Sequence, residues 1–212
     1  MNFEAFSLHP QIHAGITQAG YITPTPIQSQ AIPPILAGKD VLGLAQTGTG
    51  KTASFGLPIL QRLLRGPRGR LRALILSPTR ELAEQTHAAI TALGRQTGLR
   101  SITIYGGVGA QPQIRALKSG VEIVVACPGR LLDLMAQKAV DLRSVEILVV
   151  DEADQMFDMG FMPSIRRILA ALPSQRQTLL FSATMPAEIR SFATDLLKDP
   201  VTVEVNITRP IE

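Results

Sequence analysis

The chain has 212 residues, of which 45% are hydrophobic and 18% charged, with a formal net charge of +4. This composition is that of a globular domain with one sizeable core, and the length fits one large domain better than two small ones. No run of about 18 apolar residues predicts a membrane span, and the single cysteine, Cys127, cannot form an internal disulfide, so we expect no membrane partner and a cytoplasmic location.

Short, nearly all apolar runs alternate with helical patterns along the chain. Such runs are typical of strands buried on both faces of a parallel sheet. The predicted strands are Val41–Ala45, Ala73–Leu76, Ser101–Tyr105, Glu122–Ala126, Val145–Val150, Thr178–Phe181 and Val201–Val205. The predicted helices are Lys51–Leu64, Arg80–Arg95, Pro112–Lys118, Arg130–Ala136, Pro163–Ala171 and Pro186–Leu197. The alternation predicts an α/β fold, a doubly wound, mainly parallel sheet with helices on both faces.

This layout predicts three regions and one functional edge. Residues 1–39 are expected to be a helical or irregular segment before the sheet, residues 40–206 the sheet domain, and residues 207–212 the start of a linker. Ligands of open α/β sheets bind at the carboxyl ends of the strands. Each motif described below follows a predicted strand, except the segment Pro24–Gln28.

A glycine-rich loop between the first predicted strand and its helix is the strongest local signal. Its sequence is Ala45-Gln46-Thr47-Gly48-Thr49-Gly50-Lys51-Thr52. Glycines let backbone N–H groups approach triphosphate oxygens, and the helix N-terminus adds partial positive charge. Lys51 would reach the β- and γ-phosphates, and the Thr52 hydroxyl would ligate Mg²⁺. The usual pattern begins with Gly where this chain has Ala45, and the alternative is a turn that binds nothing.

An acidic tetrapeptide, Asp151-Glu152-Ala153-Asp154, follows the predicted strand Val145–Val150. A carboxylate at the end of a buried strand is costly unless a cation faces it. Beside a phosphate loop, that cation is expected to be Mg²⁺, held by Asp151 through water. Glu152 is the candidate to orient and deprotonate an attacking water. The alternative is an ordinary acidic helix N-terminus.

Five further motifs accompany these two. They are Gly20–Gln28, Pro78–Ala83 (P-T-R-E-L-A), Tyr105–Gly107, Cys127–Arg130 and Ser182–Thr184. With Ala45–Thr52 and Asp151–Asp154, which spells D-E-A-D, they resemble the N-terminal RecA-like domain of DEAD-box ATP-dependent RNA helicases over essentially the whole chain. The resemblance implies a RecA-like phosphate-loop domain. It also implies ATP and Mg²⁺ as cofactors, RNA as a partner, and ATP hydrolysis coupled to local RNA duplex unwinding.

The resemblance also implies that residues 1–39 pack on the core as an adenine-recognition extension. The family selects ATP with the glutamine that matches Gln28, whose amide offers the adenine edge one donor and one acceptor. Phe3 matches the aromatic residue that stacks on adenine in the family, and Tyr21 is a second candidate. The alternative for Gln28 is a surface or helix-capping role.

The family grips RNA through the backbone of one strand, which agrees with an aromatic content of only 4%. The matching loops are Pro78-Thr79-Arg80, Gly106-Gly107 and Pro128-Gly129-Arg130. The arginines supply charge and the glycines allow close approach to phosphate. The alternative for each arginine is a salt bridge that fixes a loop. The family usually has Thr where this chain has Cys127, so one RNA contact is expected to be weakened or carried by the backbone N–H.

In the family, the segment that matches Ser182-Ala183-Thr184 couples the ATP state to strand separation. This predicts hydroxyl contacts to Asp154 or its neighbours, and the alternative is N-capping of the helix near Pro186. The family's second RecA-like domain carries arginines that stabilise transition-state charge. The chain alone is therefore expected to show little or no ATPase or unwinding.

One charged run and three rival functions complete the predictions. The run Arg62, Arg65, Arg68, Arg70, Arg72 is expected to be a solvated loop at the opposite edge of the sheet rather than an RNA patch. A phosphate-loop NTPase with another substrate would lack the adenine and RNA segments. A non-catalytic scaffold would have lost Lys51 or Glu152. A DNA-directed helicase would be distinguished by RNA-versus-DNA competition.

Overall fold

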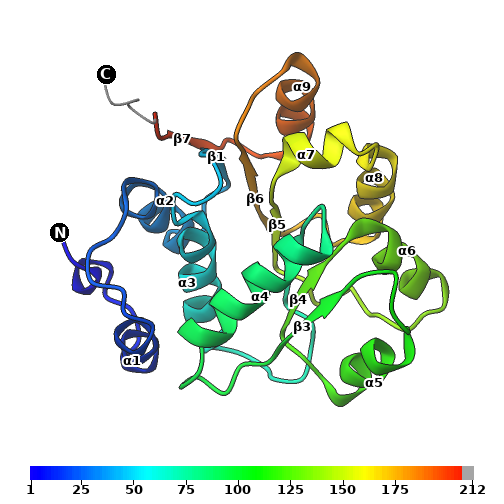
Figure 1. The fold of residues 1–212 in the computed structure, drawn as a ribbon, viewed down its shortest axis with the longest axis horizontal. Helices are drawn as coiled ribbons and strands as arrows, with labels where there is room; N and C mark the ends of the chain where they lie inside the picture. Colours follow the sequence, from blue (N-terminus) through cyan, green and yellow to red (C-terminus); the bar gives the residue numbers. More distant parts are fainter. Residues whose placement is uncertain (207–212) are drawn as a thin grey trace.

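The computed structural model describes residues 1–206, so the predicted linker start at 207–212 lies outside the described residues. Its centre is a parallel sheet in the order β3-β4-β2-β5-β6-β1-β7 (Figure 1). The strands are β1 (Val41–Leu44), β2 (Ala73–Leu76), β3 (Ser101–Ile104), β4 (Ile123–Ala126), β5 (Ile147–Val150), β6 (Gln177–Ser182) and β7 (Val201–Glu204). The predicted doubly wound α/β fold is confirmed.

Helices cover both faces of this sheet (Figure 1). One face carries α1 (Pro10–Gln18), α2 (Pro26–Leu36), α3 (Lys51–Leu63) and α4 (Arg80–Leu93), with a 3-10 turn η1 (Phe3–Phe6) before them. The other carries α5 (Gln111–Ser119), α6 (Pro128–Ala136), α7 (Ala153–Asp158), α8 (Met162–Ala171) and α9 (Ala187–Leu196). Helix α7 is absent from the predictions because its six residues are too few to show a helical period.

Alternate residues of each strand belong to two separate cores. In β2, Ile75 packs in the core that includes Ile90 of α4, whereas Leu74 and Leu76 pack in the core that includes Leu131 of α6. Successive side chains of a strand point to opposite faces, so a strand covered on both faces must be apolar at every position. Within residues 1–206, no helix is long and apolar enough to cross a membrane.

The strand order places three chain segments side by side at one edge. Strands β5, β6 and β1 are neighbours, and their carboxyl ends lead into the acidic tetrapeptide, the Ser182–Thr184 segment and the glycine-rich loop. After β1 the chain crosses to β2, which lies beyond β6 and β5. Such a reversal of strand order opens a crevice at the carboxyl ends, where ligands of this fold class bind.

The arginine run differs in part from the prediction of a solvated loop. Arg72 is 4% exposed, and its guanidinium donates to three carbonyls of the residues before it and to the Glu146 carboxylate. Arg62 also donates to Glu146, at 2.9 Å. Arg65 and Arg70 are exposed as expected. The prediction was wrong for Arg72 because the Glu146 carboxylate, which is distant in sequence, compensates its buried charge.

Candidate functional site

The glycine-rich loop presents unpartnered donors where helix α3 begins. Gly50 is the N-cap of α3 with φ 89°, and Gly48 has φ 86°. The backbone N–H groups of residues 46–50 donate to no backbone carbonyl within residues 1–206. Unpartnered N–H groups at a helix N-terminus form a binding site for anions. The loop therefore has the donor arrangement that phosphate oxygens require.

Lys51, the first residue of α3, lies between two carboxylates that follow β5. Its Nζ is 3.0 Å from Asp151 Oδ1 and donates to Glu152 Oε1. The three side chains are only 5%, 6% and 3% exposed. Burial alone would lower the pKa of Lys51, but the Asp151 and Glu152 carboxylates outweigh it and hold the pKa above 10.5. Lys51 is therefore the internal counterion of the acidic pair.

Glu152 is held in a strained backbone conformation that aims its carboxylate at the loop. Its φ of 53° lies in the left-handed region, which non-glycine residues adopt mainly where the surroundings enforce it, often at functional sites. Its N–H donates to Asp151 Oδ1 at 2.9 Å. Its Oε1 accepts from the Thr47 hydroxyl at 3.0 Å. The loop and the acidic pair are thus joined by direct hydrogen bonds.

These groups fit a triphosphate with a divalent cation. The loop offers N–H donors and a lysine, while buried Asp151 and half-buried Thr52 offer oxygen ligands. No cluster of three or more His, Cys, Asp or Glu side chains within the described chain forms a metal site by itself. A hard cation would therefore need phosphate oxygens and water to complete its coordination, which is the way Mg²⁺ is usually held.

Gln28, the predicted adenine reader, is buried in α2 and contacts the glycine-rich loop. Its Oε1 accepts from the Thr25 N–H at 2.9 Å, and its Nε2 donates to the Gly50 carbonyl at 3.0 Å. The capping alternative is therefore present in the structure. The amide keeps one further N–H and one lone pair beyond these two bonds. Reading of adenine stays a prediction.

The two aromatic candidates pack beside each other near the start of the chain. Phe3 is 4% exposed, with its ring centre 6.2 Å from that of Tyr21 and 6.0 Å from that of Phe6. Tyr21 is half-buried. Stacking on adenine would need an accessible ring face, which Tyr21 has to a greater extent than Phe3. Both roles stay predictions.

The three loops predicted to contact RNA follow the neighbouring strands β2, β3 and β4. The Arg80 guanidinium lies 5.9 Å from the Tyr105 ring centre. Arg130 donates to the Val108 carbonyl at 2.9 Å and to Gln113 Oε1 at 3.3 Å. Arg130 thus fixes the loop that contains Gly106 and Gly107, by hydrogen bonds rather than by the salt bridge of the alternative.

The remaining residues of these loops differ in their accessibility. Thr79 caps α4 by accepting from the Leu82 N–H at 3.2 Å, and Pro78 and Pro128 are buried. Gly107 and Gly129 are exposed. The Cys127 N–H donates to the Ile104 carbonyl at 2.8 Å. This N–H is thus already engaged by β3, and the effect of Cys127 on RNA binding stays a prediction.

Asp154 is bonded to the segment after β6. The Thr184 hydroxyl donates to Asp154 Oδ2 at 2.9 Å, and the Thr184 N–H donates to the same oxygen at 3.1 Å. Ser182 Oγ accepts from the Asp154 N–H at 3.3 Å. The predicted hydroxyl contacts are present. Helix α9 begins at Ala187 with no side-chain cap, so neither hydroxyl caps it. The coupling role itself stays a prediction.

The sequence analysis missed Gln113, which joins two of the loops. It is 8% exposed, donates to the Tyr105 carbonyl at 2.9 Å and accepts from Arg130. A glutamine at a buried position of α5, next to Ile114, was the available signal, because buried polar side chains require partners.

The fold and the groups gathered at the ends of β1, β5 and β6 define a RecA-like α/β domain. Residues 25–192 match the family described as DEAD/DEAH box helicase. The chain belongs to this family.

Similar proteins of known sequence or structure support this family membership. The chain is 47% identical over 205 residues to the DEAD-box ATP-dependent RNA helicase CshA of Streptococcus pneumoniae, a match that covers 97% of this chain and 39% of the relative. It is 45% identical over 194 residues to the RNA helicase CrhR of Synechocystis, covering 92% and 39%. A crystal structure of a DEAD box protein from the hyperthermophile Methanococcus jannaschii matches with a TM-score of 0.92 and 39% identity, covering 98% of this chain and 56% of that one. The chain spans about two fifths of the length of these curated relatives.

Proposed function

We propose that this chain binds ATP with Mg²⁺ at the carboxyl ends of β1, β5 and β6 and binds RNA on the adjoining loops. In the whole protein it acts with a second RecA-like domain as an ATP-dependent RNA helicase of the cytoplasm. The observation that carries the proposal is Lys51, held between Asp151 and Glu152 beside five N–H groups that donate to no backbone carbonyl among residues 1–206. A scaffold without chemistry has no need of this costly arrangement.

Nucleotide binding exchanges one set of charges for another. Lys51 would move from its carboxylates to the β- and γ-phosphates, and Glu152 would keep the hydrogen bond from the Thr47 hydroxyl. Asp151 and Thr52 would hold Mg²⁺, which would neutralise part of the phosphate charge. Glu152, kept in place by the Thr47 hydroxyl, accepts the proton of the attacking water.

RNA binding uses the loops after β2, β3 and β4. Arg80 and Arg130 contact phosphates, and the exposed Gly107 and Gly129 allow the strand close to the backbone. These contacts carry no base information, so binding is largely independent of sequence. Contacts to 2′-hydroxyls would give a preference for RNA over DNA.

The nucleotide site is tested by calorimetric titration of the chain with ATP and GTP in Mg²⁺. We expect ATP to bind more tightly than GTP, and Gln28→Ala to remove this difference. Gln30→Ala is the matched control, because Gln30 lies in the same helix with an exposed side chain and should leave the preference unchanged. Equal affinity of the unmodified chain for ATP and GTP would contradict the adenine-reading role of Gln28.

The RNA site is tested separately by competition between single-stranded RNA and DNA of equal length. We expect Arg80→Ala to weaken RNA binding and to lower its salt dependence by about one counterion, because one phosphate contact is lost. Equal binding of RNA and DNA would favour the rival DNA-directed function. Salt dependence unchanged by Arg80→Ala would remove Arg80 from the contact surface.

A further inference from the structure

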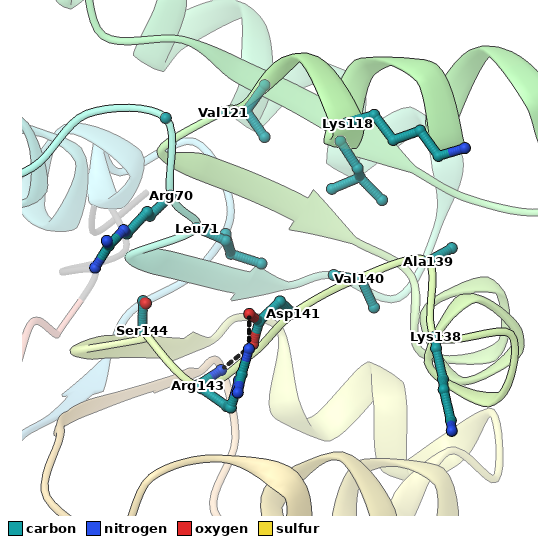
Figure 2. Close-up of a pocket in the computed structure, with 12 residues that line it drawn as sticks. Arg70, Leu71, Lys118, Val121, Lys138, Ala139, Val140, Asp141, Arg143 and Ser144 are labelled. Carbon is teal, nitrogen blue, oxygen red and sulfur yellow. Dashed lines mark hydrogen bonds and ion pairs between the residues drawn. The ribbon is translucent and has the colours of Figure 1, made fainter.

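A hollow of about 570 Å³ opens at the amino ends of β2, β4 and β5, at the opposite edge of the sheet from the candidate site (Figure 2). Its wall consists of the segments that lead into these three strands, within residues 69–71, 117–121 and 138–144. None of these residues belongs to the nucleotide or RNA site described above. The hollow therefore needs an explanation of its own.

The floor of the hollow is aliphatic. In Figure 2 the side chains of Leu71 and Val140 turn toward the same space. The apolar lining is completed by Leu117, Val121 and Ala139. No aromatic ring of the described residues, 1–206, lines the hollow, and aromatic rings are what stack on the bases of single-stranded RNA. Such a floor suits an aliphatic side chain better than a nucleobase.

The rim of the hollow is basic. Arg143 is paired with Asp141 through two hydrogen bonds of 2.9 and 3.0 Å. Arg70, Lys118 and Lys138 also line the hollow and have no carboxylate within 4.0 Å among residues 1–206. In Figure 2 their charged ends point away from the floor of the hollow, and all three residues are exposed. With Asp141 as the only carboxylate that the described residues contribute to the lining, the four cations leave the rim with a net positive charge, which attracts an anionic ligand.

The main chain beside the hollow has unused hydrogen-bonding groups. Val140 and Asp141 lie outside helices and strands, and their backbone N–H and C=O groups make no backbone hydrogen bond within residues 1–206. A second hollow of about 510 Å³, lined in part by Met135 and Leu142, borders the same segment. A peptide can pair with such main-chain groups while its side chains enter pockets.

We propose that this basic-rimmed hollow binds an acidic peptide segment of another protein, with one aliphatic side chain of that segment seated on the floor. The cations of the rim face the acidic residues, and the 140–141 backbone pairs with the main chain of the peptide. Because the hollow lies at the amino ends of the strands, its occupant leaves the nucleotide and RNA loops uncovered. A bound partner protein therefore does not compete with the nucleotide or with RNA.

The first experiment follows backbone amide NMR signals of the isotope-labelled chain during titration with a blocked peptide, Asp-Glu-Leu-Glu-Asp. We expect saturable shifts at residues 69–71, 117–121 and 138–144. The peptide with Ser in place of Leu should bind about tenfold more weakly, because it has no aliphatic group for the floor. Absence of shifts at these residues, or equal binding of the two peptides, would overturn the proposal.

Two double variants distinguish the effect of the rim cations on peptide binding from the effect of the net charge of the chain. Lys118→Glu with Lys138→Glu should weaken peptide binding at least about tenfold. The control, Lys39→Glu with Arg95→Glu, makes the same change of charge at exposed positions outside the hollow and should leave binding unchanged. Equal weakening in both would mean non-specific attraction. Single-stranded RNA that shifts the same amides at lower concentration than the peptide would assign the hollow to nucleic acid instead, and either result refutes the proposal.

Discussion

Replacing Lys51 with Met removes the counterion of two buried carboxylates. Asp151 and Glu152 have side chains only 6% and 3% exposed, and they would then face each other without a cation. Breaking a buried ion pair by removing one partner costs about 3–5 kcal/mol, because an uncompensated charge stays buried. The Thr47 hydroxyl still donates to Glu152, so we expect a loss of about 3 kcal/mol in the free energy of unfolding at neutral pH, the lower end of that range.

The loss should depend on pH. Burial raises the pKa of Asp151 above 3.8 even with Lys51 in place, and removal of the lysine raises this pKa further. A carboxyl group with a raised folded-state pKa contributes stability that is fully present below its unfolded pKa and is lost as the pH rises through the folded pKa. The deficit of Lys51→Met should therefore be small below pH 3.8 and grow toward neutral pH.

Urea unfolding of Lys51→Met over this pH range measures the effect. Adding Glu152→Gln should recover about 1–2 kcal/mol, because it removes one of the two facing charges. Lys39→Met, at an exposed position, is the control and should change little. A loss below about 1 kcal/mol at neutral pH, or a loss that does not change with pH, would refute the counterion role of Lys51.

Gly50→Ala places a Cβ 2.6 Å from Gln28 Nε2 at φ 89°, so we expect urea unfolding to show a loss of about 2 kcal/mol in the free energy of unfolding. Gly48→Ala has a similar φ of 86° but no atom within 4 Å of the new Cβ, so we expect a loss of about 1 kcal/mol. Equal losses would contradict the clash with Gln28. Burial raises the pKa of Glu146, but the Arg72 and Arg62 guanidinium groups outweigh burial and hold this pKa below 4.5. The stability that Glu146 contributes is therefore lost as the pH falls through its folded-state pKa. Thermal melts of Glu146→Gln should show a smaller loss of stability with falling pH. Burial raises the pKa of Cys127 from 9.0 to about 11, so its alkylation by iodoacetamide at neutral pH should be about a hundredfold slower than that of an ordinary thiol, and a comparable rate would disprove the burial argument.

The strands and the place of the site could be predicted because both follow from local pattern. All residues of β5 are buried, and a strand covered on both faces must be apolar throughout. The carboxyl ends of neighbouring parallel strands meet at one edge, so the Asp154–Thr184 contact could be expected from the order of the motifs. Helix α7 escaped prediction because it is short and follows the left-handed backbone of Glu152.

The partners of individual polar side chains could not be predicted. Arg72 donates to Glu146, which lies 74 positions away in the sequence, and Lys51 donates to Glu152, which lies 101 positions away. Gln28 uses both ends of its amide within the protein. Pattern reasoning assigns such residues to a surface or to a ligand, because it does not include atoms that only the tertiary fold brings close.

The strand order also determines how late in synthesis the nucleotide site can form. Within residues 1–206, strand β1 pairs with β6 and β7, so Val41 has no strand partner until Leu179 has been synthesised. Strands β2, β3 and β4 pair among themselves within residues 73–126 and have partners much earlier. The glycine-rich loop thus leaves the ribosome early, but the strands on either side of β1 emerge much later. Contacts between residues so distant in sequence form slowly, so a nucleotide cannot guide the first stages of folding and can stabilise only a nearly finished domain.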